Sequence, residues 1–279
     1  MKLRLYHHAD GARVAYREQG TGQPLILWHS ELLSHRELVP LVAELEHRYR
    51  VVLPDLPLHG DSEDRPAHPY TRRWLAEVVA GFCRDVGGAR PLVGGHGLGA
   101  EVVLEAIASG LLLPDKLVLM GNRLHRPGSR EADWNAWLVA ARAGAVPGAD
   151  RVLMRAARIA LRPQRGVQLS ARGNPEAADV VRHALADVGG NANLARSWAA
   201  FARDRPTAPR RELLDAYGQM EMPVLLLWAD EDPRHPVVGA EEALDLLPDG
   251  QLRIVPRTGY LMAWDDPVAV AREISAFCG

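Results

Sequence analysis

The chain has 279 residues, of which 47% are hydrophobic and 24% are charged, and its formal net charge is −2. This length and hydrophobic content suffice for one large α/β domain with an inserted subdomain, and they exclude a disordered chain. A near-neutral charge excludes the basic surface typical of proteins that bind nucleic acid or anionic membranes, so we expect neither partner.

Cysteine and lysine usage limits the chemistry further. The two cysteines, Cys83 and Cys278, fall far apart in expected helices, which indicates packing in a reduced compartment and no disulfide framework. The only lysines are Lys2 and Lys116, so a Schiff-base lysine is not expected. No apolar run reaches membrane-spanning length and no cleavable leader is visible, so we expect a cytoplasmic location.

The first half of the chain alternates apolar runs with helical patterns. Residues 3–8 and 13–17 alternate apolar and polar side chains around Asp10-Gly11, which predicts an antiparallel hairpin at a sheet edge. The pattern then predicts buried strands at 24–28, 51–54, 91–93 and 117–120, and helices at 35–48, 72–86 and from the glycine-rich turn to 109. This alternation predicts an α/β fold with a doubly wound, mostly parallel sheet.

Residues 122–218 interrupt the alternation. They are rich in alanine, arginine and tryptophan, carry helical patterns at 132–143 and 151–161, and contain no convincing strand pattern. A separate helical domain is one interpretation. Placement between two sheet strands favours the other, a helical lid inserted over the sheet.

The sheet pattern resumes after this segment. It predicts a strand at 223–228, a helix at 238–247, a last strand at 251–255 and a closing helix at 267–277. We therefore assign residues 1–121 and 219–279 to the core and 122–218 to the lid.

One glycine-rich turn carries the main functional signal. The apolar run Pro91-Leu92-Val93 leads through Gly95-His96-Gly97-Leu98-Gly99 into a helical pattern. A strand, a tight turn and a helix in this order are the layout of a nucleophile elbow, G-x-S-x-G. Gly97 stands at the serine position.

Five segments in this order resemble the α/β-hydrolase superfamily, in its lid-bearing branch of esterases, epoxide hydrolases, dehalogenases and carbon–carbon bond hydrolases. Besides the elbow they are His29-Ser30-Glu31, residues 54–62 with Leu58 in place of a glycine, residues 228–233, and residues 258–267. The resemblance implies an oxyanion hole formed by the backbone amides of Glu31 and Leu98. It also implies Asp232 as the triad acid and Tyr260 at the position of the catalytic histidine.

A triad needs an attacking hydroxyl or thiol and an imidazole, and Gly97 and Tyr260 supply neither. A tyrosine, with a pKa of about 10, is a poor base at neutral pH but a suitable donor or general acid. Loss of nucleophile and base costs about 10⁶-fold in a comparable protease, so ordinary ester hydrolysis is not expected. The amides of Glu31 and Leu98 could still bind an anion, enolate or carbonyl.

Glu31 leaves two interpretations open. It could be a general base whose pKa is raised by burial, with Tyr260 as the acid and Asp232 holding Tyr260 or a water. Alternatively its side chain turns outward, where it pairs with an arginine or caps the following helix.

Other residues are candidates for the pocket. His29, His59 and His96 occupy motif positions where the resemblance implies a scaffold role, whereas His125 and His235 could reach the cavity. The tryptophans fit a core, but a lid usually encloses an apolar cavity, so we expect one or two of them to line it. These are Trp134, Trp137, Trp198 and Trp264.

No metal or cofactor is expected. Asp230, Asp232 and His235 form only a weak metal constellation, more simply explained as a loop and a triad remnant. Neither a dinucleotide fingerprint nor a phosphate loop is present.

Three hypotheses remain. The first is an enzyme that binds a small, mostly apolar or aromatic molecule and performs non-hydrolytic acid–base chemistry, such as cyclisation, isomerisation, elimination or decarboxylation. The second is a non-catalytic receptor or scaffold, and the third is an atypical hydrolase that activates water directly. We favour the first. The sequence leaves open whether the chain forms a homodimer.

Overall fold

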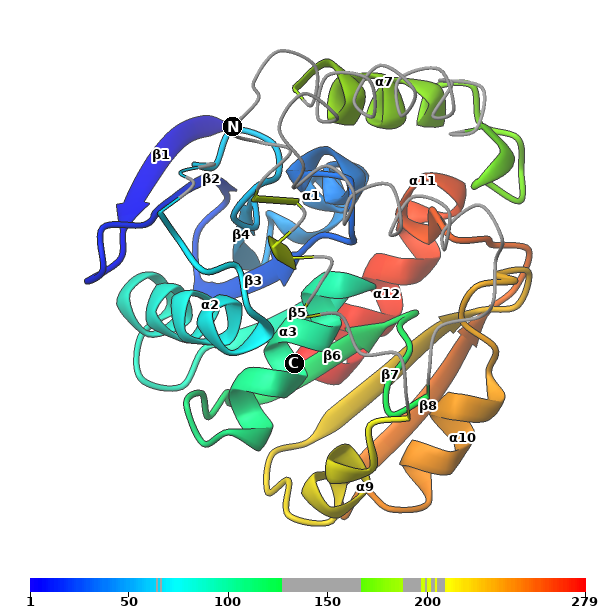
Figure 1. Ribbon diagram of the computed structural model, residues 1–279. Coiled ribbons are helices and arrows are strands. Elements are labelled where there is room, and N and C mark those ends of the chain that lie inside the picture. Colours follow the sequence, from blue (N-terminus) through cyan, green and yellow to red (C-terminus); the bar gives the residue numbers. More distant parts are fainter. Residues whose placement is uncertain are drawn as a thin grey trace.

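The computed structural model describes residues 1–63, 65, 67–126, 167–187, 197–198, 200–201, 204 and 209–279. Within these residues one sheet runs in the order β1-β2-β4-β3-β5-β6-β7-β8 (Figure 1). The strands are β1 (Lys2–His7), β2 (Arg13–Gln19), β3 (Gln23–Trp28), β4 (Tyr49–Pro54), β5 (Leu92–His96), β6 (Lys116–Met120), β7 (Val224–Ala229) and β8 (Gly250–Val255). Strands β1, β2 and β4 pair antiparallel, and all other pairs are parallel. The predicted edge hairpin and the predicted mostly parallel α/β sheet are both confirmed.

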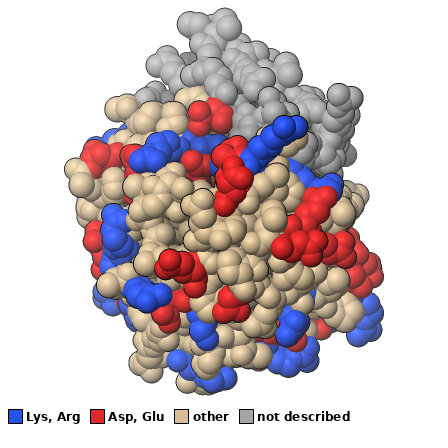
Figure 2. All heavy atoms as spheres, turned by 90° about the horizontal axis from the view of Figure 1, so that it is seen from below, with Lys and Arg blue, Asp and Glu red and all other residues tan. Residues whose placement is uncertain are grey.

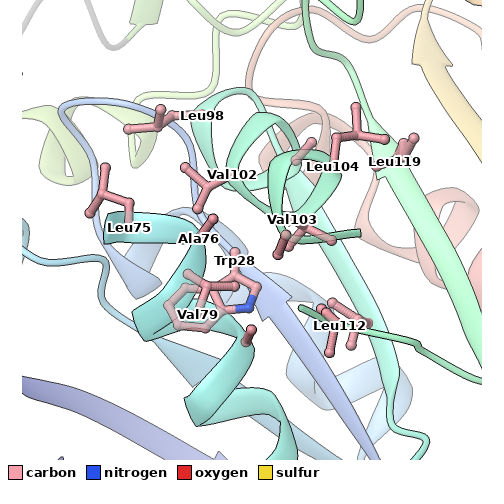
Figure 3. Close-up of a cluster of buried hydrophobic side chains, with 14 of the residues drawn as sticks. Trp28, Leu75, Ala76, Val79, Leu98, Val102, Val103, Leu104, Leu112 and Leu119 are labelled. Atoms are coloured by element: carbon pink, nitrogen blue, oxygen red, sulfur yellow. The ribbon is translucent and has the colours of Figure 1, made fainter. Parts of the chain in front are cut away.

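One face of the sheet packs against α2 (Arg72–Gly87) and α3 (Leu98–Ala108). Figure 3 shows the centre of this layer, where Val79 of α2 and Val102 of α3 lie close to Trp28 of β3. The ring of Trp28 also meets Phe82 edge to face, with the ring centroids 5.2 Å apart. This packing fixes the start of α3, and therefore the elbow that precedes it.

The opposite face packs against α1 (Pro40–Leu45) and α12 (Pro267–Cys278). Leu25 and Leu27 point to this face, whereas their neighbours in β3 belong to the first layer. Because both faces are covered by helices, the inner strands are apolar throughout, as the continuous runs in the sequence predicted.

The helix predicted at 35–48 is wrong in detail. The structure has a short 3-10 helix, η1 (His35–Leu38), followed by α1. Pro40 causes the division, because it lacks a backbone N–H and fits only the first turn of a helix. The change places Glu37 in η1, where it becomes part of the site.

The remaining described helices are α7 (Ala177–Asp187), α9 (Arg211–Tyr217), α10 (Val238–Leu244) and α11 (Met262–Asp265). α9 buries Leu213 and Tyr217 in the same layer as α2 and α3. α7 lies apart from the sheet in Figure 1, and its Val180 belongs to a small apolar cluster with Leu33 and Leu261. The helical patterns at 132–143 and 151–161 lie outside the described residues, as do Trp134 and Trp137, so the extent of the lid stays a prediction.

The surface carries no concentration of one charge on the face shown in Figure 2. Basic and acidic side chains are interspersed there and separated by uncharged atoms. Among the described residues, no helix combines the length and the apolar character needed to cross a membrane.

Candidate functional site

The candidate site lies where the parallel strands end. β3 leads into His29-Ser30-Glu31 and β5 leads into Gly97, while β7 and β8 lead toward Asp232 and Tyr260. Because parallel strands present their carboxyl ends at one edge of a sheet, segments far apart in the sequence meet there.

The elbow keeps its shape although it has no side chain. Gly97 has φ +50° and ψ −119° and immediately precedes α3. Its N–H donates to Gly121 O at 2.9 Å, and Gly99 N–H donates to His29 O at 3.1 Å. Leu98 is the first residue of α3, so its N–H belongs to the turn whose amides have no partner within the helix.

The space that a nucleophile would occupy is filled. A Cβ atom at position 97 would lie 2.8 Å from the Cβ atom of Ser30 and 3.5 Å from the hydroxyl oxygen of Tyr260. Ser30 stands where the resembled motif has a glycine. Ser30, which follows the neighbouring strand β3, therefore places a hydroxyl group beside the elbow.

Glu37 holds these two strand ends together, although no motif in the sequence indicated it. Its side chain is buried, and Oε2 accepts the backbone N–H of Ser30 at 2.6 Å. Oε1 accepts the Ser30 hydroxyl at 2.8 Å and lies 2.6 Å from His96 Nδ1. Burial opposes ionisation, but the charge and hydrogen bond of His96 hold the pKa of Glu37 below its ordinary value. His96 is thus oriented by a carboxylate, and its scaffold role is a specific one.

Asp232 orients a histidine that follows it three residues later. His235 Nδ1 lies 2.7 Å from Asp232 Oδ2, while Asp232 Oδ1 accepts the backbone N–H of Arg234. Burial lowers the pKa of His235, and its hydrogen bond to Asp232 opposes that effect. We expected Asp232 to hold Tyr260 or a water, whereas its carboxylate bonds to His235. The Asp-x-x-His spacing was the only sequence signal for this pair.

Tyr260 packs against both histidines, whose own ring centroids are 5.9 Å apart. Its ring centroid is 4.9 Å from that of His96 and 5.6 Å from that of His235, whose ring stacks on it at 25°. The guanidinium of Arg234 lies over the same ring, 4.9 Å from the centroid. Burial, followed by the charge of Glu37, raises the pKa of Tyr260 above its ordinary value. Its hydroxyl therefore stays protonated and can donate a hydrogen bond throughout the neutral range.

Glu31 is partly buried at the same edge, among charged neighbours. Burial raises its pKa to about 8, and the nearby Arg123 is the main effect in the opposite direction. Glu101 raises the pKa too, whereas Arg72 and Arg234 lower it. At neutral pH the Glu31 carboxyl is mostly protonated, which suits a donor better than a base.

The other candidate histidines have structural partners. His29 Nδ1 lies 2.7 Å from Ser30 O, and its Nε2 accepts the N–H of Leu56 at 2.9 Å, so both nitrogens are engaged. His59 Nδ1 bonds to Pro57 O. His125 Nε2 lies 3.0 Å from Glu242 of α10. None of these three bonds to a triad-equivalent residue.

Two tryptophans of the predicted set are described. Trp264 packs against the apolar cluster of Leu33, Val180 and Leu261, beside Tyr260. Trp198 is buried and meets Phe201 and His59 edge to face. The first forms an apolar wall next to the polar site.

Three leucines near the site adopt left-handed backbone angles. They are Leu32 (φ +65°), Leu58 (φ +72°) and Leu124 (φ +53°). Each conformation costs about 1–2 kcal/mol for a residue with a Cβ atom. Leu58 stands where the resembled motif has a glycine, so the backbone of that motif persists despite the substitution. Such strain clusters at functional sites.

Two described groups have the residue types of a metal site. Ligand atoms of His96, Asp232 and His235 all lie within 4.8 Å of one another, as do those of His35, Asp55 and Asp61. In the first group the 2.7 Å contact between Asp232 and His235 is a hydrogen bond. In the second, Asp55 accepts the backbone N–H groups of His35 and Asp61. Both carboxylates accept hydrogen bonds from protein donors in the structure.

Comparisons with known proteins identify the family and the fold. Residues 25–273 match the alpha/beta hydrolase family. The uncharacterised hydrolase YugF of Bacillus subtilis is 24% identical over 277 residues, covering 96% of this chain and 95% of that protein. A soluble epoxide hydrolase of Corynebacterium sp. is 32% identical over 126 residues, 43% of each chain.

Solved structures show the same fold over the whole length. A thermophilic esterase from Thermogutta terrifontis superposes with a TM-score of 0.75 at 21% identity, covering 100% of this chain and 98% of that one. The enol-lactonase from Burkholderia xenovorans gives the same TM-score at 18% identity, covering 99% of both chains. The chain belongs to the alpha/beta hydrolase family.

Proposed function

We propose that this chain binds a small molecule at the carboxyl edge of its sheet and catalyses a proton transfer without hydrolysis, as an isomerase, cyclase, lyase or decarboxylase. The observation that carries the proposal is the pair formed by His235 and Tyr260. A neutral imidazole oriented by Asp232 stacks on a buried phenol, next to an elbow without a nucleophile.

The roles follow from protonation. The Nδ1 atom of His235 faces Asp232, which leaves Nε2 with the lone pair that accepts a proton. Tyr260 keeps its proton because its pKa is raised, so it serves as a hydrogen-bond donor to the oxyanion. His235 therefore replaces Glu31 as the base in our first hypothesis, and the protonated Glu31 becomes a second donor.

In this mechanism His235 Nε2 removes a proton from a carbon beside a carbonyl group, and the electron pair of the C–H bond moves to the carbonyl oxygen as an enolate. The Leu98 amide and the Tyr260 hydroxyl stabilise the oxyanion. Return of the proton at another atom completes an isomerisation, and loss of a leaving group from the enolate completes an elimination. No covalent enzyme intermediate forms.

The apolar cluster beside Tyr260 supports an apolar ligand body. Leu33, Leu261 and Trp264 form that wall, and the carbonyl of the ligand would lie between it and the elbow. Pocket sites of this kind combine apolar walls with a few polar groups that fix orientation.

Direct hydrolysis is the second candidate, and the names of the relatives favour it. An imidazole held by a carboxylate can deprotonate a water as well as a carbon acid. The relatives include an epoxide hydrolase and an enol-lactonase. A receptor without catalysis is the third.

An isotope experiment separates the three. The protein is incubated in heavy-oxygen water and, separately, in deuterated water with enolisable ketones, lactones and epoxides that carry an aromatic group. We expect deuterium exchange or rearrangement at carbon without uptake of heavy oxygen, lost in His235→Gln and Tyr260→Phe and kept in His125→Gln. Uptake of heavy oxygen in the product would establish hydrolysis. Binding without any turnover would establish a receptor, and either result would overturn the proposal.

A further inference from the structure

A buried arginine beside the site has two donors without acceptors. Arg72 is the first residue of α2, and it is only 8% exposed. Its Nη1 donates to Glu101 Oε2 at 3.1 Å. Its Nε and Nη2 atoms are buried and have no hydrogen-bond partner among the residues that the structure describes. Buried donors of this kind are normally satisfied, so these two indicate an absent acceptor.

The geometry of the two donors defines that acceptor. In a guanidinium the Nε–H and the Nη2–H bonds point to the same side and run parallel. This side-on fork matches the two oxygens of a carboxylate in a bidentate pair. The bond to Glu101 uses the other nitrogen, so the fork is left intact.

The nearby acidic groups are engaged elsewhere. Asp204 accepts the backbone N–H of Arg72. Glu212 bonds to Arg210 Nε at 2.9 Å. Glu101 is held by Arg72 itself. None of these described carboxylates fills the fork.

Arg72 belongs to the candidate site and not to a remote part of the core. Its charge acts on Glu31 at the end of β3, as do the charges of Arg123 and Arg234. Its partner Glu101 lies in the first turn of α3, directly after the elbow, and is also influenced by His235. Arg72 and Arg123 therefore act on both Glu101 and Glu31, whereas Arg234 acts on Glu31.

We propose that Arg72 forms a carboxylate subsite, and that the ligand of this protein is a monocarboxylate with an apolar body. A single negative charge fits best, because Glu101 lies against the same guanidinium and repels a second one. The inference deepens the proposed function by naming the class of substrate. The subsite rests on the proposed function only in one respect, namely that the bound carboxylate is also a substrate.

Binding of benzoate, with benzamide as its neutral counterpart, tests the subsite by titration followed with ligand-observed NMR. We expect benzoate to bind the native protein and benzamide to bind at least about tenfold more weakly, since a charged bidentate pair is lost. Arg73→Gln is the matched control, because Arg73 is the next residue of α2 and its side chain is 56% exposed, paired with Glu77. That variant keeps native affinity for benzoate.

Arg72→Gln would leave the buried Glu101 carboxylate without its cation and could prevent this variant from folding. Two other variants avoid this problem. Arg72→Lys keeps a positive charge for Glu101 but removes the fork, and Arg72→Gln/Glu101→Gln removes both charges. We expect both variants to fold, with native far-ultraviolet circular dichroism, and to bind benzoate at least about tenfold more weakly. Native affinity in a folded Arg72→Lys would overturn the subsite, as would equal binding of benzoate and benzamide. Tighter binding of inorganic phosphate than of benzoate would overturn the carboxylate assignment.

His235→Gln separates the subsite from the catalytic proposal. We expect this variant to bind benzoate with native affinity while it loses proton transfer. If benzoate binding depends on Arg72 but no substrate is turned over, the subsite stands and the catalytic proposal fails. If turnover occurs but the Arg72 variants bind benzoate normally, the subsite alone fails.

Discussion

Ser30 leaves no room for a side chain at position 97. A Cβ atom built on Gly97 would lie 2.8 Å from the Cβ atom of Ser30. The tightest real Cβ contacts are longer than this, so a side chain at one position requires movement at the other. The family pattern of glycine at the first position and a nucleophile at the second is inverted in this chain. We therefore expect that the single substitution Gly97→Ser does not restore hydrolase activity.

We expect Gly97→Ser to destabilise the fold by about 2 kcal/mol or more, because left-handed strain adds to overpacking. Gly110→Ser is the control for strain alone, since Gly110 has φ +68° and nothing lies within 4 Å of its Cβ position. That change costs about 1 kcal/mol. Addition of Ser30→Gly to Gly97→Ser recovers about 1 kcal/mol as a coupling energy. Urea denaturation of these three variants and of Ser30→Gly alone gives the values needed, and strictly additive effects would show that the two positions do not touch.

Glu31 makes stability fall as pH rises. Its carboxyl has a pKa of about 8 in the folded chain, against an ordinary value of 4.5. The folded state keeps a proton that the unfolded state releases, so the stabilisation present below about pH 4.5 is lost as pH rises toward 8. We expect Glu31→Gln to be more stable than the native chain at pH 8, on the order of 1–3 kcal/mol, and to show no gain near pH 4.

Urea midpoints across this pH range provide the measurement for Glu31. Glu77→Gln is the control, because Glu77 is exposed and pairs with Arg73 one helical turn away. We expect its stability to follow the native curve at every pH. A constant difference between Glu31→Gln and the native chain would show that the pKa of Glu31 is ordinary.

If His235 is the base, the rate of turnover falls at low pH, where the imidazole is protonated. Because its pKa is lowered in the folded chain, the base is active at neutral pH and is lost only at a pH below about 6.5. We expect kcat/KM to decline below that value. Asp232→Asn removes the carboxylate that fixes the tautomer, and in a serine protease the same change costs about 10⁴-fold. We expect a loss of about 10²- to 10⁴-fold here, and a profile that stays flat at low pH would exclude His235 as the base.

Chelators test the histidine cluster. The bond between His235 and Asp232 leaves no room for an ion between their ligand atoms, which lie 2.7 Å apart. We expect dialysis against a chelator to leave the melting temperature and the turnover unchanged. Elemental analysis supplies the direct measurement. One zinc per chain, lost in His96→Ala, would reverse this expectation.

The sequence predicted the sheet well because inner strands covered on both faces are apolar without interruption, as in residues 224–229 of β7. It predicted the position of Gly97, because a strand, a glycine turn and a helix are contiguous in the chain. It missed the break at Pro40, since a helical hydrophobic pattern continues through a proline that opens a new helix.

The site was harder to predict than the fold. Glu37 acts on Ser30 and His96, and its separations of 7 and 59 residues from them carry no pattern. His235 was a candidate without a role, because a loop has no periodicity that fixes the direction of a side chain. The sequence could not predict the two free donors of Arg72, because they depend on which neighbouring side chains bond to it in the folded chain.

The Glu37 carboxylate has a consequence for the order of folding. Its acceptor bonds join a loop after β3 to the end of β5, and those strands are neighbours only in the assembled sheet. We therefore expect the bonds to form after the strands have paired. Interactions made after the transition state govern the rate of unfolding and leave the rate of folding nearly unchanged. We therefore expect removal of the Glu37 carboxylate to speed unfolding and to leave the rate of folding nearly unchanged.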